Sequence, residues 1–164
     1  MNRDSEDSQD WIGEWYDRHG AVLYRYALMI LANDAAAADA VQHVFLMLVS
    51  GGRPKPVQEH HYLRRAIRNE CFSTLRRRRR TPQSLDSDQS LLESLQADRD
   101  RPDDRIALER ALRTLPPEQR ETVHLKLFEG FTFEEMADLT SESLNTMKSR
   151  YRYALEKLRT ALAK

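Results

Sequence analysis

Polar and basic residues recur every three or four positions along residues 144–162, a spacing that places side chains on one face of an α-helix. The members of this face are Asn145, Lys148, Ser149 and Arg152. Lysine and arginine bind guanine edges or phosphates, asparagine binds adenine, and serine can serve either base. Residues 148–164 hold six Lys or Arg against one acid, Glu156. The face therefore predicts contact with a DNA duplex, and a merely solvated helix surface is the alternative.

A second helical face, over residues 61–79, carries arginines around Asn69. Its basic members are Arg64, Arg65, Arg68 and the run Arg76–Arg80, and the opposite, apolar stripe is Leu63, Ile67, Cys71 and Leu75. An asparagine amide both donates and accepts hydrogen bonds. Tyr62 and Phe72 are the aromatic residues of this stretch, and Phe72 fits the core better. A general nucleic-acid patch is the alternative for the five consecutive arginines.

The remaining reactive side chains do not form the pattern of an enzyme or a metal site. His60 and His61 are adjacent and cannot share one helix face, and the other histidines are scattered without a zinc-protease or nucleophile signature. Cys71 is the single cysteine, which excludes an intramolecular disulfide and a cysteine-rich zinc site. We therefore expect a binding protein that is not an enzyme and holds no metal or cofactor.

Charge and hydropathy predict the compartment of the protein and its affinity for DNA. The 164 residues contain 26 basic and 26 acidic side chains, but the basic ones gather on the two faces described above. Affinity for duplex rises with the number of phosphates neutralised, so a neutral chain should bind DNA poorly alone. The sequence has no signal peptide and no apolar stretch of membrane-spanning length. With a single cysteine, these features predict a protein of the reducing cytoplasm.

The elements that must position the first face form a helix-turn-helix. Pro116 and Pro117 can end one helix and begin another, predicted from about Pro117 to Glu129 and broken at Gly130. Thr132 stands three residues before Glu135, the spacing of a capping box, and opens a helix of about two turns.

The turn and the last helix complete the motif. Thr140, Ser141 and Glu142 form the turn, in which a left-handed residue would fall on Ser141 at a cost of about 1 kcal/mol. Ser143 is predicted to cap the last helix, which in this motif enters the major groove. The predicted buried stripe of that helix is Leu144, Met147, Tyr151, Leu155, Leu158 and Leu162.

A further helix begins at Asp34, which is predicted to cap it. Its inward residues are Val41, Val44, Phe45 and Leu48, and its outward stripe is Asp39, Gln42 and Leu46. Upstream, the predicted core residues are Trp11, Trp15, Leu23, Tyr26 and Ile30. Taken alone, this pattern is compatible with a plain core helix that has a polar back.

The chain is predicted to be all-α, with two small helical domains, residues 1–80 and 106–164. Residues 81–105 hold seven acids, three arginines and two prolines without sustained apolar periodicity, which predicts a flexible acidic linker. Each domain is near the lower size limit for burying its own core.

The motifs above resemble those of sigma-70 family RNA polymerase sigma factors, in particular the extracytoplasmic-function group. The stretches LERALRTLPPEQRETVHLKLFEGFTFEEMA and NTMKSRYRYALEKLR are similar to the promoter-reading domain of that family, and YLRRAIRNECFSTLRRRRR resembles its minus-ten helix. Asp39, Gln42 and Phe45 match the polymerase-binding pattern AEDxxQxxF, but Ala38 and His43 replace its acids, so weaker docking is expected. The turn Thr140–Glu142 also departs from the family's Leu-Gly pair.

The resemblance implies a transcription initiation factor that binds core RNA polymerase, promoter DNA and an anti-sigma factor, in the cytoplasm of a bacterium. The implied polymerase-binding residues are Asp39, Gln42, Phe45 and Leu46. The implied minus-ten residues are Tyr62, Arg65, Arg68, Asn69 and Arg76. The implied minus-thirty-five residues are Ser143, Asn145, Thr146, Lys148, Ser149, Arg150 and Arg152.

Two other classes of protein stay open at this point. An autonomous helix-turn-helix repressor or activator would bind a palindromic site as a dimer, whereas a sigma factor needs polymerase and protects an asymmetric promoter. A pure interaction protein would bind polymerase or an anti-sigma factor without touching DNA.

Overall fold

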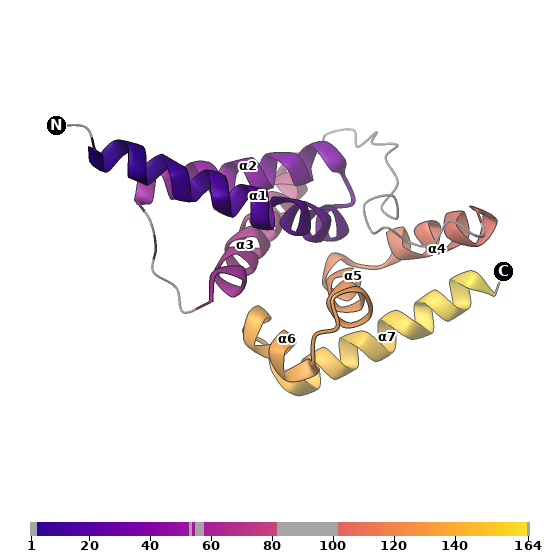
Figure 1. Ribbon diagram of the computed structural model, residues 1–164. Helices are drawn as coiled ribbons and strands as arrows, with labels where there is room; N and C mark the ends of the chain where they lie inside the picture. The colour runs from indigo at the N-terminus through magenta and orange to yellow at the C-terminus, as the bar shows by residue number, and fades with distance from the viewer. Residues whose placement is uncertain (1–2, 53, 55–57, 82–101, 164) are drawn as a thin grey trace.

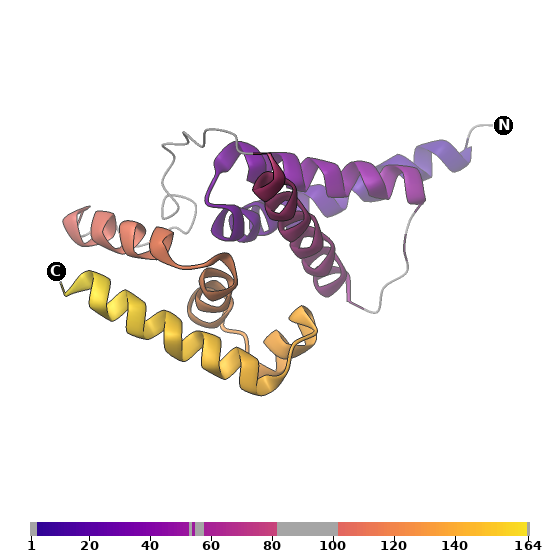
Figure 2. The ribbon, with the colours of Figure 1, turned by 180° about the vertical axis from the view of Figure 1, so that it is seen from behind.

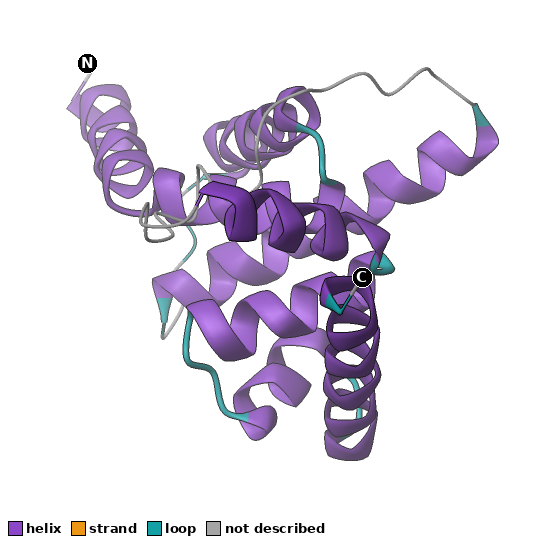
Figure 3. Cartoon of the chain, turned by 90° about the vertical axis from the view of Figure 1, so that its right-hand side faces the viewer, coloured by secondary structure: helices purple, strands orange, loops and turns teal. Residues whose placement is uncertain are grey.

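The computed structural model describes residues 3–52, 54, 58–81 and 102–163, and side chains from Trp11 onward. All regular structure in these ranges is helical, as predicted (Figure 3). The helices are α1 (Arg3–Leu31), α2 (Asp34–Gly51), α3 (Glu59–Arg80), α4 (Pro102–Thr114), α5 (Pro117–Val123), the π-helical turn η1 (His124–Phe128), α6 (Phe133–Thr140) and α7 (Leu144–Leu162). In the described ranges, no helix has the length and apolarity needed to cross a membrane.

The first three helices pack around a shared apolar core. Helices α1 and α2 lie side by side, and α3 crosses them (Figures 1 and 2). The predicted core residues Trp11, Trp15, Leu23, Tyr26 and Ile30 are all buried, as are Leu63, Ile67 and Cys71 of α3. The capping residue of α2 is Asn33 and not Asp34, because the Asn33 side chain accepts the Ala36 amide at 2.8 Å. Asp34 follows in the first turn, where its charge favours the helix dipole.

The C-terminal helices differ from the prediction at two places, the start of α4 and the end of the helix that begins at Pro117. Helix α4 starts at Pro102, inside the stretch predicted as linker, because proline suits a first turn and Asp103 and Asp104 complement the dipole there. The rest of the predicted linker, residues 82–101, lies outside the described residues. The predicted helix from Pro117 continues as α5, but its last turn is the π-helix η1, in which the Glu129 amide donates to the His124 carbonyl.

The helix-turn-helix consists of α6, the turn and α7. The predicted capping box is present, since Thr132 accepts the Glu135 amide at 3.1 Å and Glu135 accepts the Thr132 amide at 2.8 Å. Ser141 adopts the predicted left-handed conformation, with φ 57° and ψ 34°. The buried stripe of α7 differs from the prediction: Met147 and Leu158 are buried, but Ala154 takes the inward place given to Leu155. A helix returns to nearly the same face after seven residues, which places Ala154 on the face of Met147. Leu155 and Leu162 stand eight residues after Met147 and Ala154, and both are exposed.

The N-terminal helices α1–α3 and the C-terminal helices α4–α7 pack against each other. Helix α1 contacts α5, and α3 contacts α6 (Figure 2). A single apolar cluster includes buried residues of both halves, from Trp11 to Leu158. The predicted strand-binding helix α3 therefore lies between its own half and the helix-turn-helix.

Candidate nucleic-acid interface

Helix α7 presents a free polar face. Asn145, Lys148 and Arg152 are exposed, whereas Met147, Ala154 and Leu158 bury the opposite side. Ser149 is half-buried between these two faces. The guanidinium of Arg152 lies over the ring of Tyr153, 5.1 Å from its centroid. Three donor side chains thus project from one side of the second helix of the motif, where a major groove would meet them.

Ser143 and Thr146, which also belong to the predicted minus-thirty-five set, form hydrogen bonds at the N-terminus of α7. The Ser143 hydroxyl accepts the Thr146 amide at 3.0 Å, and the two side-chain hydroxyls lie 2.8 Å apart. Ser143 is therefore the predicted cap, and both hydroxyls have partners within the chain.

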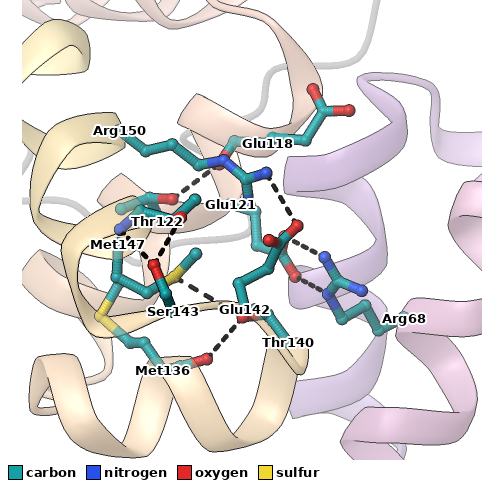
Figure 4. A network of polar contacts seen from close by, with 11 residues as sticks. Arg68, Glu118, Glu121, Thr122, Met136, Thr140, Glu142, Ser143, Met147 and Arg150 are labelled. Atoms are coloured by element: carbon teal, nitrogen blue, oxygen red, sulfur yellow. Dashed lines mark hydrogen bonds and ion pairs between the residues drawn. The ribbon is translucent and has the colours of Figure 1, made fainter.

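Arg150 is also held within the motif. Its Nη2 donates to Glu142 Oε1 at 2.9 Å, and the Arg150 side chain is 24% exposed. Figure 4 shows Arg150 directed toward Glu142 at the turn. This pair links the first turns of α7 to the turn that precedes the helix.

The predicted minus-ten residues divide into two groups. The first group lines a hollow of about 620 Å³ between α2 and α3, and consists of Tyr62, Asn69 and Arg76. His43 and Glu70 face each other across it, with 3.6 Å between Nε2 and Oε2. The hollow combines an aromatic ring, an amide and a guanidinium, which are groups that hold a base and its phosphate.

The second group, Arg65 and Arg68, faces the C-terminal half. Nε and Nη2 of Arg68 donate to the two carboxylate oxygens of Glu121 at 2.7 and 3.2 Å (Figure 4). Nη2 of Arg65 donates to the backbone carbonyl of Asp138 at 2.8 Å. Burial lowers the pKa of Arg68, but the Glu121 carboxylate outweighs this effect and raises the pKa above its usual value. Arg68 is therefore charged, and both arginines already have partners within the chain.

The predicted polymerase-binding residues lie on α2. Asp39, Gln42 and Leu46 are exposed, and 58% of the Leu46 side chain is accessible. Phe45 differs because it is buried and its ring packs edge-on against Tyr16 at 5.2 Å between centroids. Together with Gln42 and Leu46 it lines a hollow of about 770 Å³ between α1 and α2. A partner would touch the exposed stripe and reach Phe45 only through this hollow.

Cys71 and the histidines form no reactive site in the described part of the chain. Cys71 is fully buried, and burial raises the pKa of its thiol, so the reactive thiolate is suppressed. No group of three potential metal ligands occurs among the described residues.

Buried polar residues lie between the two halves, and the sequence did not predict their contacts. Tyr26 Oη donates to Glu121 Oε1 at 2.5 Å, and burial raises the pKa of this phenol, so it stays protonated as a donor. Arg120 donates to the carbonyls of Met29 and Ile30. One signal in the sequence was the pair Arg120–Glu121, which places two charges on a short helix that also buries Val123. Such charges indicate a buried polar contact.

Two family profiles together match most of the chain. The profile described as Sigma-70 region 2 matches residues 15–81, and that described as Sigma-70, region 4 matches residues 105–158.

Two relatives that align over most of their length are named as RNA polymerase sigma factors. The chain is 30% identical over 158 residues to "ECF RNA polymerase sigma factor SigL" of Mycobacterium tuberculosis, covering 90% of this chain and 86% of the relative. It is 30% identical over 165 residues to "RNA polymerase sigma factor CarQ" of Myxococcus xanthus, covering 99% and 95%.

Two solved structures share the fold. One is the sigma factor RpoE in complex with the anti-sigma factor NepR from Bartonella quintana, with a TM-score of 0.70, 22% identity and coverage of 94% of this chain and 98% of that one. The other is CnrH in complex with the cytosolic domain of CnrY, with a TM-score of 0.59, 21% identity and coverage of 94% and 89%.

Proposed function

Because the chain belongs to the extracytoplasmic-function group of sigma-70 family RNA polymerase sigma factors, we propose that it binds core polymerase, captures the melted minus-ten strand and reads the minus-thirty-five element. The proposed action consists of binding alone, and the chain makes or breaks no covalent bond. It takes place on the nucleoid, in the bacterial cytoplasm.

The observation that carries this proposal is the free face of α7. Asn145, Lys148 and Arg152 are exposed on the second helix of a helix-turn-helix, and no carboxylate pairs with Lys148 or Arg152 in the described structure. Lysine and arginine contact guanine or phosphate, and asparagine contacts adenine. Arg150 is assigned to a phosphate at the edge of the helix, with Ser143, Thr146 and Ser149 in supporting contacts.

The hollow between α2 and α3 is the proposed strand-binding site. Asn69 would satisfy the edge of an unstacked base, Tyr62 would stack on it, and Arg76 would hold a phosphate. Arg65 and Arg68 belong to the same site, on the neighbouring part of α3. This division gives single-stranded and double-stranded DNA separate surfaces.

The proposed polymerase contact is the exposed stripe of α2, with Asp39, Gln42 and Leu46 at the surface and Phe45 in the hollow beside them. Its proposed place is a first domain, residues 1–80, which a linker joins to a reading domain that begins with α4 at Pro102. One solved neighbour is a sigma factor in complex with an anti-sigma factor, which supports the proposal that such a protein also regulates this chain.

The deciding experiment is transcription in vitro with bacterial core polymerase, with and without this chain, on DNA from its own upstream region. We expect transcripts only when both proteins are present, and an asymmetric footprint on the promoter. A footprint on a palindrome without polymerase would instead indicate an autonomous regulator.

Two variants test the division of labour. Asn69→Ala should reduce strand opening about 5- to 150-fold, the equivalent of one base contact of about 1–3 kcal/mol, while polymerase binding is kept. Lys148→Ala with Arg152→Ala should abolish recognition of the upstream element and also spare polymerase binding. Permanganate reactivity measures opening, and footprinting measures upstream recognition. Equal loss of both activities in both variants would contradict the division.

A further inference from the structure

A hollow of about 380 Å³ lies where α1 and α3 meet the π-helix η1. Its polar and aromatic lining consists of Arg25, Arg64, His124, Phe128, Glu129 and Phe131. None of these side chains lines either of the hollows beside α2, and none belongs to the proposed DNA or polymerase contacts. The hollow is therefore a separate feature of the molecule, and the proposed function leaves it unexplained.

The charges of the lining leave one cation without a partner. Arg64 forms an ion pair with Glu129, and Glu129 Oε1 lies 2.9 Å from His124 Nε2, so both carboxylate oxygens face a partner. Burial raises the pKa of Glu129, but its contacts with His124 and Arg64 outweigh this effect and hold the pKa below its usual value. Arg25 is half-buried, and no described residue forms a hydrogen bond or an ion pair with it. A half-buried cation without a counter-charge favours an anion in the space beside it.

His124 contributes a hydrogen-bonding atom that the chain does not use. Its side chain is 3% exposed, and Nδ1 is buried without a hydrogen-bond partner in the described structure. Nε2 faces a carboxylate, which only accepts, so Nε2 carries the proton of the neutral ring and Nδ1 is an acceptor. A buried acceptor without a donor is costly, and the site therefore favours a ligand that donates a hydrogen bond at this point.

Aromatic rings flank these polar groups. The Phe128 ring stacks on that of His124, with 5.9 Å between centroids, and the Arg64 guanidinium lies over the Phe131 ring, 5.0 Å from its centroid. Phe128 is 40% exposed, so part of its ring is open to contact. Aromatic rings pack favourably on other planar rings, in offset or edge-to-face arrangements. The lining thus suits a planar ligand better than a branched aliphatic one.

We propose that this hollow binds a small aromatic carboxylate that carries a hydroxyl group. The carboxylate accepts two hydrogen bonds from the Arg25 guanidinium, the ring packs on Phe128, and the hydroxyl donates to His124 Nδ1. One uncompensated cation matches a monoanion, whereas a doubly charged phosphate would bring an excess charge close to the Glu129 carboxylate. The volume lies near the lower end for small-molecule sites, which suits a ligand with a single ring.

The test measures the binding of 4-hydroxybenzoate to the full-length chain by isothermal titration calorimetry, with neither polymerase nor DNA present. We expect saturable binding of one ligand per chain. Arg25→Gln should weaken it about tenfold or more, because the anion loses its charged partner. Arg110→Gln makes the same change of charge at an exposed position of α4 and should leave the affinity unchanged. Absence of saturable binding in the wild type, or an equal loss in both variants, overturns the proposal.

Related compounds test each part of the ligand. The uncharged 4-hydroxybenzyl alcohol should not bind, and benzoate, which lacks the hydroxyl, should bind about 2- to 12-fold more weakly than 4-hydroxybenzoate. Equal affinities for these two acids would contradict the contact with His124. Inorganic phosphate and adenosine monophosphate represent the doubly charged alternative. If either binds more tightly than 4-hydroxybenzoate, and Arg25→Gln removes that binding, the assignment to an aromatic carboxylate is wrong.

NMR chemical-shift mapping locates the ligand on the chain. The backbone amides around Arg25 and Phe128 should shift during the titration, and those around Lys148 on α7 should not. The opposite pattern overturns the proposal. If Arg25→Gln loses helical circular dichroism, Val22→Phe takes its place, because the larger side chain fills the hollow from α1 and keeps every charge. Binding that persists unchanged in Val22→Phe would show that the ligand lies elsewhere.

Discussion

Ser141 shows how a single residue departs from the most favourable choice for its place. Its backbone is left-handed at the end of α6, and its amide donates to the carbonyls of Ala137 and Asp138. A residue with a Cβ is strained in this conformation, which glycine adopts freely. The helix ends here nonetheless, because Ser143 caps α7 immediately afterwards and fixes the direction of the chain.

Ser141→Gly is therefore expected to stabilise the protein by about 0.5–1 kcal/mol, the relief of left-handed strain less the extra entropy of glycine in the unfolded chain. Urea unfolding followed by circular dichroism measures the change. Ser141→Ala is the control and should not stabilise, because it keeps the Cβ. A loss of stability in the glycine variant would show that the serine side chain supports the turn.

At the scale of the element, α6 is defined by its capping box. The Glu135 side chain accepts the Thr132 amide, and this hydrogen bond is the main reason that the pKa of Glu135 lies below its usual value. A depressed carboxyl pKa means that the ionised form favours the folded helix. Its contribution is present above the usual pKa and disappears as the pH falls through the depressed one.

We expect an NMR titration of the Glu135 side chain to show a midpoint below that of an unperturbed glutamate. In Thr132→Ala the hydroxyl that accepts the Glu135 amide is lost and the box is weakened, so the midpoint should move back toward the usual value. The same side chain in the urea-unfolded protein provides the reference. A Glu135 midpoint equal in the folded and unfolded protein would contradict the capping role in solution.

Local signals explain why some elements were predictable and others were not. The capping box, the Ser141 conformation and the Ser143 cap follow from residue type and spacing, and the structure confirms all three. The inward position of Ala154 was missed because the larger and more apolar Leu155 follows it. Ala154 stands seven residues after Met147, and this spacing places it, and not Leu155, on the buried face. The Asn33 cap was missed because asparagine and aspartate adjoin, and both suit that position.

The free face of α7 was predictable for the same reason, since helical spacing alone places Asn145, Lys148 and Arg152 together. The partners of Arg65 and Arg68 were not predictable, because no local pattern tells which distant helix will pack on α3. Buried ion pairs between halves of a chain are properties of the tertiary arrangement.

At the scale of the whole molecule, each half completes the hydrogen bonding of the other. The carbonyls in the last turn of a helix lack partners within it, and a cation there also favours the dipole. Helix α1 has no basic residue in its own last turn. Arg120 of α5 supplies the charge, and donates to the carbonyls of Met29 and Ile30 and to that of Leu115.

Arg120→Ala is therefore expected to lower the free energy of unfolding by about 3–5 kcal/mol, because it removes three charged hydrogen bonds and leaves buried carbonyls unpaired. Burial lowers the pKa of Arg120 to about 10, so the side chain is still charged at neutral pH and the loss should be full there. Thermal and urea unfolding measure it, with the exposed Arg110→Ala on α4 as the control, expected to change stability by less than about 0.5 kcal/mol. If the two alanine variants were equally stable, the carbonyls at the end of α1 would have water as their partner in solution, and the two halves would not depend on each other for stability.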